Sequence, residues 1–194
     1  MKKETNGNNY ISKDTFMYQM IQKCGYMKTL EVFFREPTSL HFIRSISKKI
    51  NLAQTSVRNH VKFLLENQMI IEKKSIPFGG YIANRENTNF IFYKMIYNLA
   101  SLKLLKDFLV ENFYPKGIIL FGSYLRGEDL ESSDIDLFVL SNTKNNLNLI
   151  SFEKSLGRKI NILFSDSLSK LDKKIQNKIK QGFILEGDLD GWNF

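Results

Sequence analysis

The chain has 194 residues and a mass of 22.7 kDa, a size that suits one large domain or two small ones. With 43% hydrophobic and 25% charged residues it has the composition of a soluble protein that buries a core, and no apolar run approaches the roughly 18 residues of a membrane-spanning helix. One cysteine excludes an internal disulfide and a multi-cysteine zinc site, and the polar N-terminus has no signal-peptide pattern, so we expect a cytoplasmic protein.

The net charge of +8 is unevenly distributed along the chain. Residues 1–86 hold 14 Lys and Arg against 7 Asp and Glu, whereas residues 87–194 hold 14 against 13. A basic module joined to a nearly neutral one indicates that the first part meets a polyanion.

The first part of the chain begins with two helical patterns. Apolar side chains recur at helical spacing over residues 14–34, with an interruption near Gly25. Thr38 or Ser39 is in position to cap a second helix over residues 40–50.

A third helix and a hairpin follow. Thr55 or Ser56 starts the helix, and two strands are expected at residues 69–74 and 81–83, with a turn at 77–80. The apolar residues expected on the buried side of this helix are Val57, Val61, Phe63, Leu64 and Leu65.

Three helices followed by a hairpin is the order of a winged helix-turn-helix domain, and residues 46–74 resemble that family in detail. The resemblance implies that residues 55–64 are a recognition helix and that the hairpin is the wing, with double-stranded DNA as the partner. The alternative is a solvated face of a helical domain that packs against a protein. The candidate DNA-contacting residues are Gln54, Ser56, Arg58, Asn59, Lys62, Lys73 and Lys74.

Residues 87–114 form a long apolar-periodic stretch that predicts one bent helix or two, connecting the two domains. Its aromatic residues favour core packing or a homodimer through this connecting helix over base stacking.

A phosphate-binding and metal-binding pattern occupies the second half of the chain. The apolar run at 118–121 indicates a buried strand that ends in Gly122 and Ser123, and ten residues later come Asp134 and Asp136. Period-two spacing places both carboxylates on one face of a second strand. Mg²⁺ relieves the repulsion between two such carboxylates, since it prefers one or two carboxylates together with phosphate oxygens and water. Glycine lets the backbone approach a phosphate, and we expect Ser123 to begin a helical turn that favours an anion.

This pattern resembles the DNA polymerase β-like nucleotidyltransferase superfamily, most closely its minimal prokaryotic members, among them the archaeal-type proteins with an N-terminal winged helix. The resemblance implies that Gly122 and Ser123 hold the phosphates of a nucleoside triphosphate, ATP by default. It also implies that Asp134 and Asp136 bind one or two Mg²⁺ ions that promote attack on the α-phosphorus. Arg126 is within reach of a phosphate oxygen.

The sequence departs from the family pattern at the third carboxylate. Residues 157–164 match the family pattern at the start of the strand that carries the third carboxylate, but Asn161 occupies the position of that acid. An amide has no charge and cannot act as a base. Asp166 is about 16 Å further along an extended strand, and Glu153 belongs to the preceding helix.

The predicted fold is α+β, with an N-terminal winged helix-turn-helix domain (1–86), a connecting helix (87–114) and a C-terminal nucleotidyltransferase domain (115–194) whose mixed sheet is flanked by helices. In the tail, residues 167–181 predict a basic amphipathic helix whose lysines form a solvated face, capped by Gly182 and followed by a short strand.

Two functions remain open. One is an enzyme that transfers a nucleoside monophosphate to a small molecule or to a protein, for which the resemblance suggests an antitoxin that modifies a helical toxin. The other is a DNA-binding transcriptional regulator whose degenerate nucleotidyltransferase domain senses a nucleotide.

Overall fold

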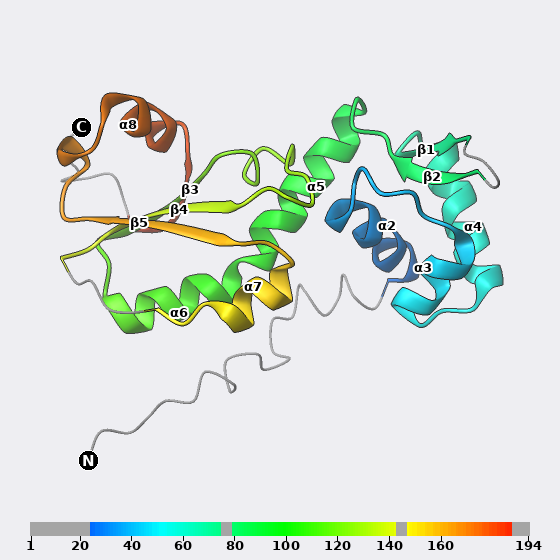
Figure 1. Ribbon diagram of the computed structural model, residues 1–194, viewed down its shortest axis with the longest axis horizontal. Coiled ribbons are helices and arrows are strands. Elements are labelled where there is room, and N and C mark those ends of the chain that lie inside the picture. The colour runs from blue at the N-terminus through cyan, green and yellow to red at the C-terminus, as the bar shows by residue number, and fades with distance from the viewer. Residues whose placement is uncertain (1–23, 75–78, 143–146, 188–194) are drawn as a thin grey trace, which may run out of the picture. The chain divides into compact units, whose positions relative to one another are not determined.

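The computed structural model describes residues 24–74, 79–142 and 147–187, and the chain divides into two compact units (Figure 1). The boundary between the units lies at Tyr97 and Asn98, inside helix α5 (Thr88–Ser101). In the part of the chain that is described, no helix is long and apolar enough to cross a membrane. The first part of the helical pattern expected over residues 14–34, and the first half of the hairpin turn expected at 77–80, lie outside the described residues.

Among its described residues, the N-terminal unit has three helices and a hairpin in the predicted order, followed by the first part of α5. The helices are α2 (Gly25–Arg35), α3 (Ile43–Ile50) and α4 (Gln54–Glu66), and the strands are β1 (Ile70–Lys73) and β2 (Gly80–Ala83). The two strands pair antiparallel, with Ile70 opposite Ala83. One core cluster unites these elements with the first part of α5, and its residues include Phe33, Phe34, Ile46, Val57, Ile70 and Phe90.

The prediction for the start of α3 was wrong. Helix α3 begins at Ile43 rather than after Thr38 or Ser39, because His41 forms an antiparallel bridge to Tyr81 of β2 through two backbone hydrogen bonds of 2.8 and 2.9 Å. The extended segment before α3 therefore pairs with the hairpin.

Two further details of α4 differ from the prediction. The helix begins at Gln54, one or two residues earlier than expected, with Ala53 at its N-cap. Phe63, expected on the buried side, is 48% exposed and packs edge-on against Tyr26, with the ring centroids 5.0 Å apart.

The C-terminal unit is a mixed four-stranded sheet between two layers of helix, as predicted. Its strands are β3 (Gly117–Phe121), β4 (Ile135–Leu140), β5 (Ile160–Ser165) and β6 (Phe183–Gly187), in the order β5-β4-β3-β6. Strand β4 runs parallel to β5, and β3 runs antiparallel to both of its neighbours. Figure 1 shows α6 (Lys103–Phe113) and α7 (Ile150–Leu156) on one face of the sheet and α8 (Lys173–Lys180) on the other.

The alternation of side chains along β4 assigns each residue to one of these two layers. Ile135, Leu137 and Val139 belong to the core beneath α6 and α7, whereas Phe138 and Leu140 belong to the smaller core beneath α8. Period-two geometry therefore places Asp136, which precedes Phe138 by two residues, on the α8 side of the sheet.

The amphipathic helix expected over residues 167–181 is broken into two pieces. A 3-10 turn (Leu168–Lys170) is followed by α8, whose N-cap Asp172 accepts a hydrogen bond from the backbone N–H of Lys174 at 2.8 Å. A side-chain cap at this position starts a new helix, which explains why the pattern does not run as one. The expected cap, Gly182, lies one residue beyond the observed C-cap Gln181.

Candidate active site

The two carboxylates of the predicted metal pair lie at the beginning of β4. Asp134 immediately precedes the strand, and Asp136 is its second residue. Both are partly exposed, whereas Ile135 between them is fully buried. The buried isoleucine fixes the strand against the core, so the two flanking side chains project to the opposite face together.

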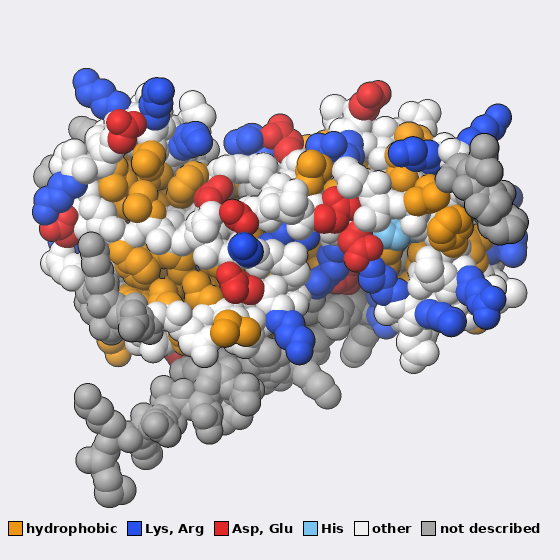
Figure 2. Space-filling view, viewed as in Figure 1, with side chains coloured by type: hydrophobic (Ala, Val, Ile, Leu, Met, Phe, Trp, Pro, Cys, Tyr) orange, Lys and Arg blue, Asp and Glu red, His pale blue; other side chains and the backbone are white. Residues whose placement is uncertain are grey.

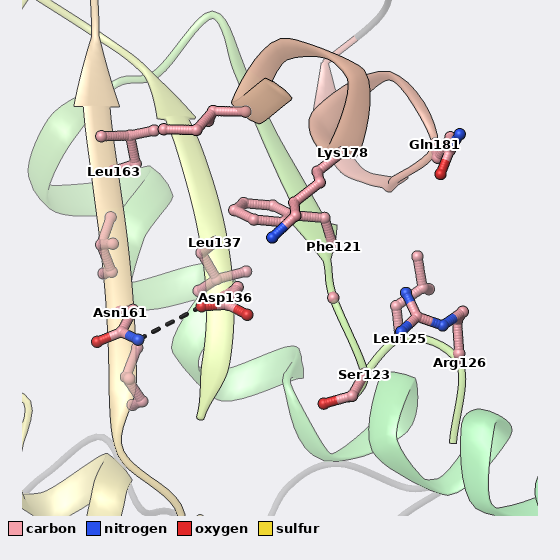
Figure 3. A pocket seen from close by; sticks show the side chains of 14 residues that line it. Phe121, Ser123, Leu125, Arg126, Asp136, Leu137, Asn161, Leu163, Lys178 and Gln181 are labelled. Atoms are coloured by element: carbon pink, nitrogen blue, oxygen red, sulfur yellow. Dashed lines mark hydrogen bonds between the residues drawn. The ribbon is translucent and has the colours of Figure 1, made fainter. Parts of the chain in front are cut away.

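Asn161 completes this group from the neighbouring strand. In the parallel pairing of β4 with β5, Asn161 lies directly beside Asp136. Its amide Nδ2 donates to Asp134 Oδ2 at 3.0 Å. It also donates to Asp136 Oδ1 at 3.4 Å (Figure 3). One neutral side chain thus bridges the two carboxylates.

Gly122 brings the backbone turn at the end of β3 into contact with the carboxylate of Asp136. Its φ of +85° lies in the left-handed region, and a Cβ at this position would meet Asp136 Oδ2 at 2.6 Å. The turn and the strand approach each other closely only because residue 122 has no side chain.

The segment after Ser123 corrects one expectation. Residues 123–127 are a series of turns rather than the first turn of a helix, and the loop is closed by hydrogen bonds from Gly127 N to Tyr124 O at 3.4 Å and from Glu128 N to Ser123 O at 3.1 Å. Phosphate binding here would use the turn and the serine hydroxyl rather than a helix dipole.

Arg126 lines the cleft, but its guanidinium is engaged. Its Nε donates to Glu128 Oε2 at 2.7 Å, and both side chains are more than half exposed. An exposed pair of this kind is weak and is exchanged easily for another anion.

Among the described residues, neither alternative third acid forms a metal-binding cluster with the carboxylate pair. Glu153 of α7 accepts from the backbone N–H of Ile160 at 3.0 Å and so anchors the start of β5. Asp166 lies just beyond the opposite end of β5 and pairs with Lys170 at 2.5 Å.

A cleft of about 670 Å³ lies between the sheet and α8. Its lining includes Gly122, Ser123, Arg126, Asp136 and Asn161, together with Ile175, Lys178 and Gln181 at or near α8. Figure 3 shows Lys178 extending from the helix past the ring of Phe121 into the cleft. The sequence interpretation missed Lys178, although its position between Ile175 and Ile179 on the apolar side of the helix was a usable signal.

A buried polar network supports the loop that joins the two halves of the site. Arg158 pairs with Asp129 at 3.1 Å, and the two side chains are 5% and 1% exposed. Asn98 of α5 donates to Asp129 Oδ1 at 2.8 Å and to the backbone carbonyl of Tyr124 at 2.7 Å. The network thereby links the start of β5 and the end of α5 to the segment between Ser123 and Asp134.

Comparison with known proteins decides the family. Residues 102–185 match the model of the family described as "Nucleotidyltransferase domain". "Putative protein adenylyltransferase MJ1379" of Methanocaldococcus jannaschii is 40% identical over 70 residues, an alignment that covers 32% of this chain and 70% of that protein. The chain belongs to the nucleotidyltransferase family.

A second relative has the same description. "Putative protein adenylyltransferase MJ1215" of the same organism is 43% identical over 58 residues, which cover 29% of this chain and 67% of that protein. The nucleotidyltransferase match includes α6, the helix before the sheet, together with β3, β4, β5 and the first part of β6.

The donor set of the cleft fits a magnesium ion. The described part of the chain holds no cluster of three or more His, Cys, Asp and Glu side chains arranged to bind a metal. The nucleotidyltransferase domain instead offers two carboxylates and the amide oxygen of Asn161, which are hard oxygen donors of the kind that Mg²⁺ prefers. Rotation of the Asn161 amide would exchange its nitrogen for this oxygen.

The predicted DNA-contacting residues lie in the N-terminal unit. Six of them (Gln54, Arg58, Asn59, Lys62, Lys73 and Lys74) are exposed, and Ser56 is half-buried. Lys62 makes only a loose pair with Glu66, at 3.9 Å. Figure 2 shows Lys and Arg side chains spread over the visible face of this unit.

Proposed function

We propose that this nucleotidyltransferase binds a nucleoside triphosphate with Mg²⁺, by default ATP, and transfers the nucleoside monophosphate to a hydroxyl group. The observation that carries the proposal is the contact between Gly122 and Asp136: a Cβ on the glycine would lie 2.6 Å from the carboxylate oxygen. To bind a triphosphate that is bridged by a metal ion, a site requires a phosphate-binding turn next to a metal ligand.

In the proposed reaction the acceptor oxygen forms a bond to the α-phosphorus while the bond from the α-phosphorus to the β-phosphate oxygen breaks. Pyrophosphate leaves, and the acceptor's proton passes to a base. Gly122 and Ser123 would bind the β- and γ-phosphates, and Arg126 would exchange Glu128 for a phosphate oxygen. Asp134 and Asp136 would hold one or two Mg²⁺ ions, with Asn161 as a neutral ligand.

The proposed acceptor is a hydroxyl group on a partner protein. The support is the description of both relatives as protein adenylyltransferases. A helical toxin modified by this chain as its antitoxin is the specific partner that we propose, and a small-molecule hydroxyl is the alternative acceptor.

Transfer of labelled AMP tests this proposal. The protein is incubated with α-labelled ATP and Mg²⁺, and candidate helical partner proteins and small hydroxyl compounds are supplied in turn. Wild type should label an acceptor and release pyrophosphate, whereas Asp136→Ala should not. Calorimetry accompanies the assay, because ATP should bind with Mg²⁺ and lose the metal-dependent part of its affinity in Asp136→Ala. Equal ATP affinity with and without Mg²⁺ would reject the role of the carboxylates.

A second candidate function has its own support in the N-terminal unit. Three helices, a hairpin and an exposed row of polar and basic side chains on α4 fit a winged helix-turn-helix domain that contacts double-stranded DNA. Together with the neutral Asn161, this favours a transcriptional regulator whose nucleotidyltransferase domain senses a nucleotide.

Titration of labelled duplex DNA at two salt concentrations tests the regulator. Binding through phosphate contacts should weaken steeply with salt, and Arg58→Ala or Lys62→Ala should lower both the affinity and its salt dependence. Lys116→Ala, an exposed cation of the C-terminal unit, is the matched control and should change neither. No binding at low salt would exclude this function.

A homodimer through the connecting segment is also proposed. The exposed apolar side chains on α5 that support it are Phe92, Tyr93 and Ile96, at 52%, 45% and 39% exposure. Sedimentation of wild type and Phe92→Ser would decide it, since a dimer through this face should dissociate in the variant.

A further inference from the structure

Helix α8 is held in one orientation above the cleft, and this orientation directs Lys178 inward. The next residue, Ile179, is fully buried in the core beneath α8 with Ile119 and Phe138. Lys178 and Ile175 both line the cleft, one turn apart on the same side of the helix. The long side chain of Lys178 runs past Phe121 toward the site (Figure 3).

The end of α8 lies unusually close to β3. A Cβ on Gly182 would meet Ile119 Cγ2 at 2.3 Å and the carbonyl oxygen of Leu120 at 2.7 Å. Only glycine permits this approach, which brings the C-terminal end of the helix next to the strand that leads into Gly122. The position of Lys178 relative to the phosphate-binding turn is therefore set by the packing of Ile179 in the core and by the close approach of Gly182 to β3.

The charged side chains that line the cleft indicate a role for Lys178. The cationic side chains that line the cleft are Arg126 and Lys178. Arg126 pairs with Glu128, whereas Lys178 makes no ion pair within the described part of the chain. Mg²⁺ neutralises only part of the charge of a triphosphate, so a phosphate-binding cleft needs a further cation.

We propose that Lys178 binds the polyphosphate of the nucleotide and makes the site prefer a triphosphate to a monophosphate. The proposal rests on the function proposed above. An ammonium group offers three donors that adapt to phosphate oxygens, and its bonds to phosphate are charge-assisted. Lys178 enters the cleft from α8, whereas Ser123 enters it from the turn after β3, so two separate elements would bind the phosphates (Figure 3).

Calorimetric titration of the full chain with three probes tests this role, each with Mg²⁺: ATP, AMP and inorganic tripolyphosphate. The variants are Lys178→Ala, Lys178→Arg and the control Lys173→Ala, which removes the same charge from an exposed position of α8 that does not line the cleft. Lys178→Ala should bind ATP and tripolyphosphate roughly 10-fold more weakly, the lower end of the range for a charged hydrogen bond, because the side chain is exposed. AMP affinity should stay the same, and Lys178→Arg should retain most of the ATP affinity.

The outcomes separate this inference from the proposed function. Wild type that binds ATP with Mg²⁺ while Lys178→Ala binds it equally well overturns the role of Lys178 alone. An equal loss in Lys173→Ala means that general positive charge, rather than this position, is responsible, and also overturns it. Wild type that binds neither ATP nor tripolyphosphate overturns the proposed function and the inference together. Thermal denaturation confirms in each case that the variant is folded.

Discussion

The amide nitrogen of Asn161 donates a hydrogen bond to Asp134 Oδ2, 3.0 Å away. In the pairing of β4 with β5, Asn161 is the direct neighbour of Asp136. Two carboxylates and one amide therefore share the point where the strands β4 and β5 begin. The neutral member reduces the negative charge that the group offers to a metal ion, and it removes a possible base.

Replacing Asn161 with Asp should raise transfer activity. The substitution restores a third charge beside the carboxylate pair without changing side-chain size, which should tighten the metal and supply a base for the acceptor hydroxyl. General-base assistance contributes about 10² to 10⁴ in rate, so labelled AMP transfer by Asn161→Asp should exceed that of wild type by a measurable part of this factor. A fast wild type that gains nothing from the change would mean that another residue supplies the base.

Replacing Gly122 with Ala should impair nucleotide binding more than it impairs folding. The new Cβ would collide with Asp136 Oδ2 at 2.6 Å, and a φ of +85° is strained for alanine by about 1–2 kcal/mol. Affinity for ATP with Mg²⁺ should fall at least tenfold, measured by calorimetry. Gly79→Ala is the control, because Gly79 has no positive φ and a Cβ there would meet its nearest atom at 3.2 Å. Unchanged affinity in Gly122→Ala would show that the turn does not approach the phosphates.

The strands of the nucleotidyltransferase domain were predictable because their residues alternate between two cores. The buried run at 118–121 and the alternation of carboxylates with apolar residues around Ile135 indicate strands without any tertiary information. Strand β5 pairs with β4 so that Asn161 lies beside Asp136. The family pattern at residues 157–164 predicts this neighbouring strand as the place of the third acid.

What the sequence could not supply depends on contacts between distant segments. The extended backbone at His41 exists because Tyr81 of β2 pairs with it, so local capping signals at Thr38 and Ser39 were misleading. Likewise, the spacing of Lys178 between Ile175 and Ile179 indicates that it lies on the apolar side of α8, but not that this side borders a cleft. That depends on the packing of Ile179 and Gly182 against the sheet.

The stability of the N-terminal unit should fall in mildly acidic solution because of His60. Burial lowers the pKa of this histidine below its ordinary value of 6.5, with its ring against Tyr26 and its Nδ1 3.0 Å from Thr29 Oγ1. The unfolded chain then binds a proton at a higher pH than the folded one does. The stabilisation is therefore fully present above pH 6.5 and is lost as the pH falls through 6.5 toward the lower, folded-state pKa.

Urea unfolding of wild type and His60→Gln at pH 7.5 and 5.5 measures this effect. The carboxylates titrate in both proteins, so their contribution cancels in the comparison. The midpoint of wild type should decrease more than that of His60→Gln between the two pH values. Parallel decreases would mean that His60 has the same pKa in the folded and unfolded chain.

Removing the carboxylate of Asp129 should destabilise the nucleotidyltransferase domain far more than removing an exposed one. Asp129→Asn breaks the ion pair between Asp129 and Arg158, whose side chains are 1% and 5% exposed, and breaking such a buried pair costs about 3–5 kcal/mol. Asp107→Asn breaks partly exposed pairs with Lys103 and Lys106 and should cost no more than about 1 kcal/mol. Denaturant unfolding of both variants gives the two losses of unfolding free energy.

Because Asn98 joins Asp129 to the carbonyl of Tyr124, ATP affinity should also fall in Asp129→Asn and stay unchanged in Asp107→Asn. Similar small losses of stability in the two variants would show that the buried network does not hold the loop between Ser123 and Asp134.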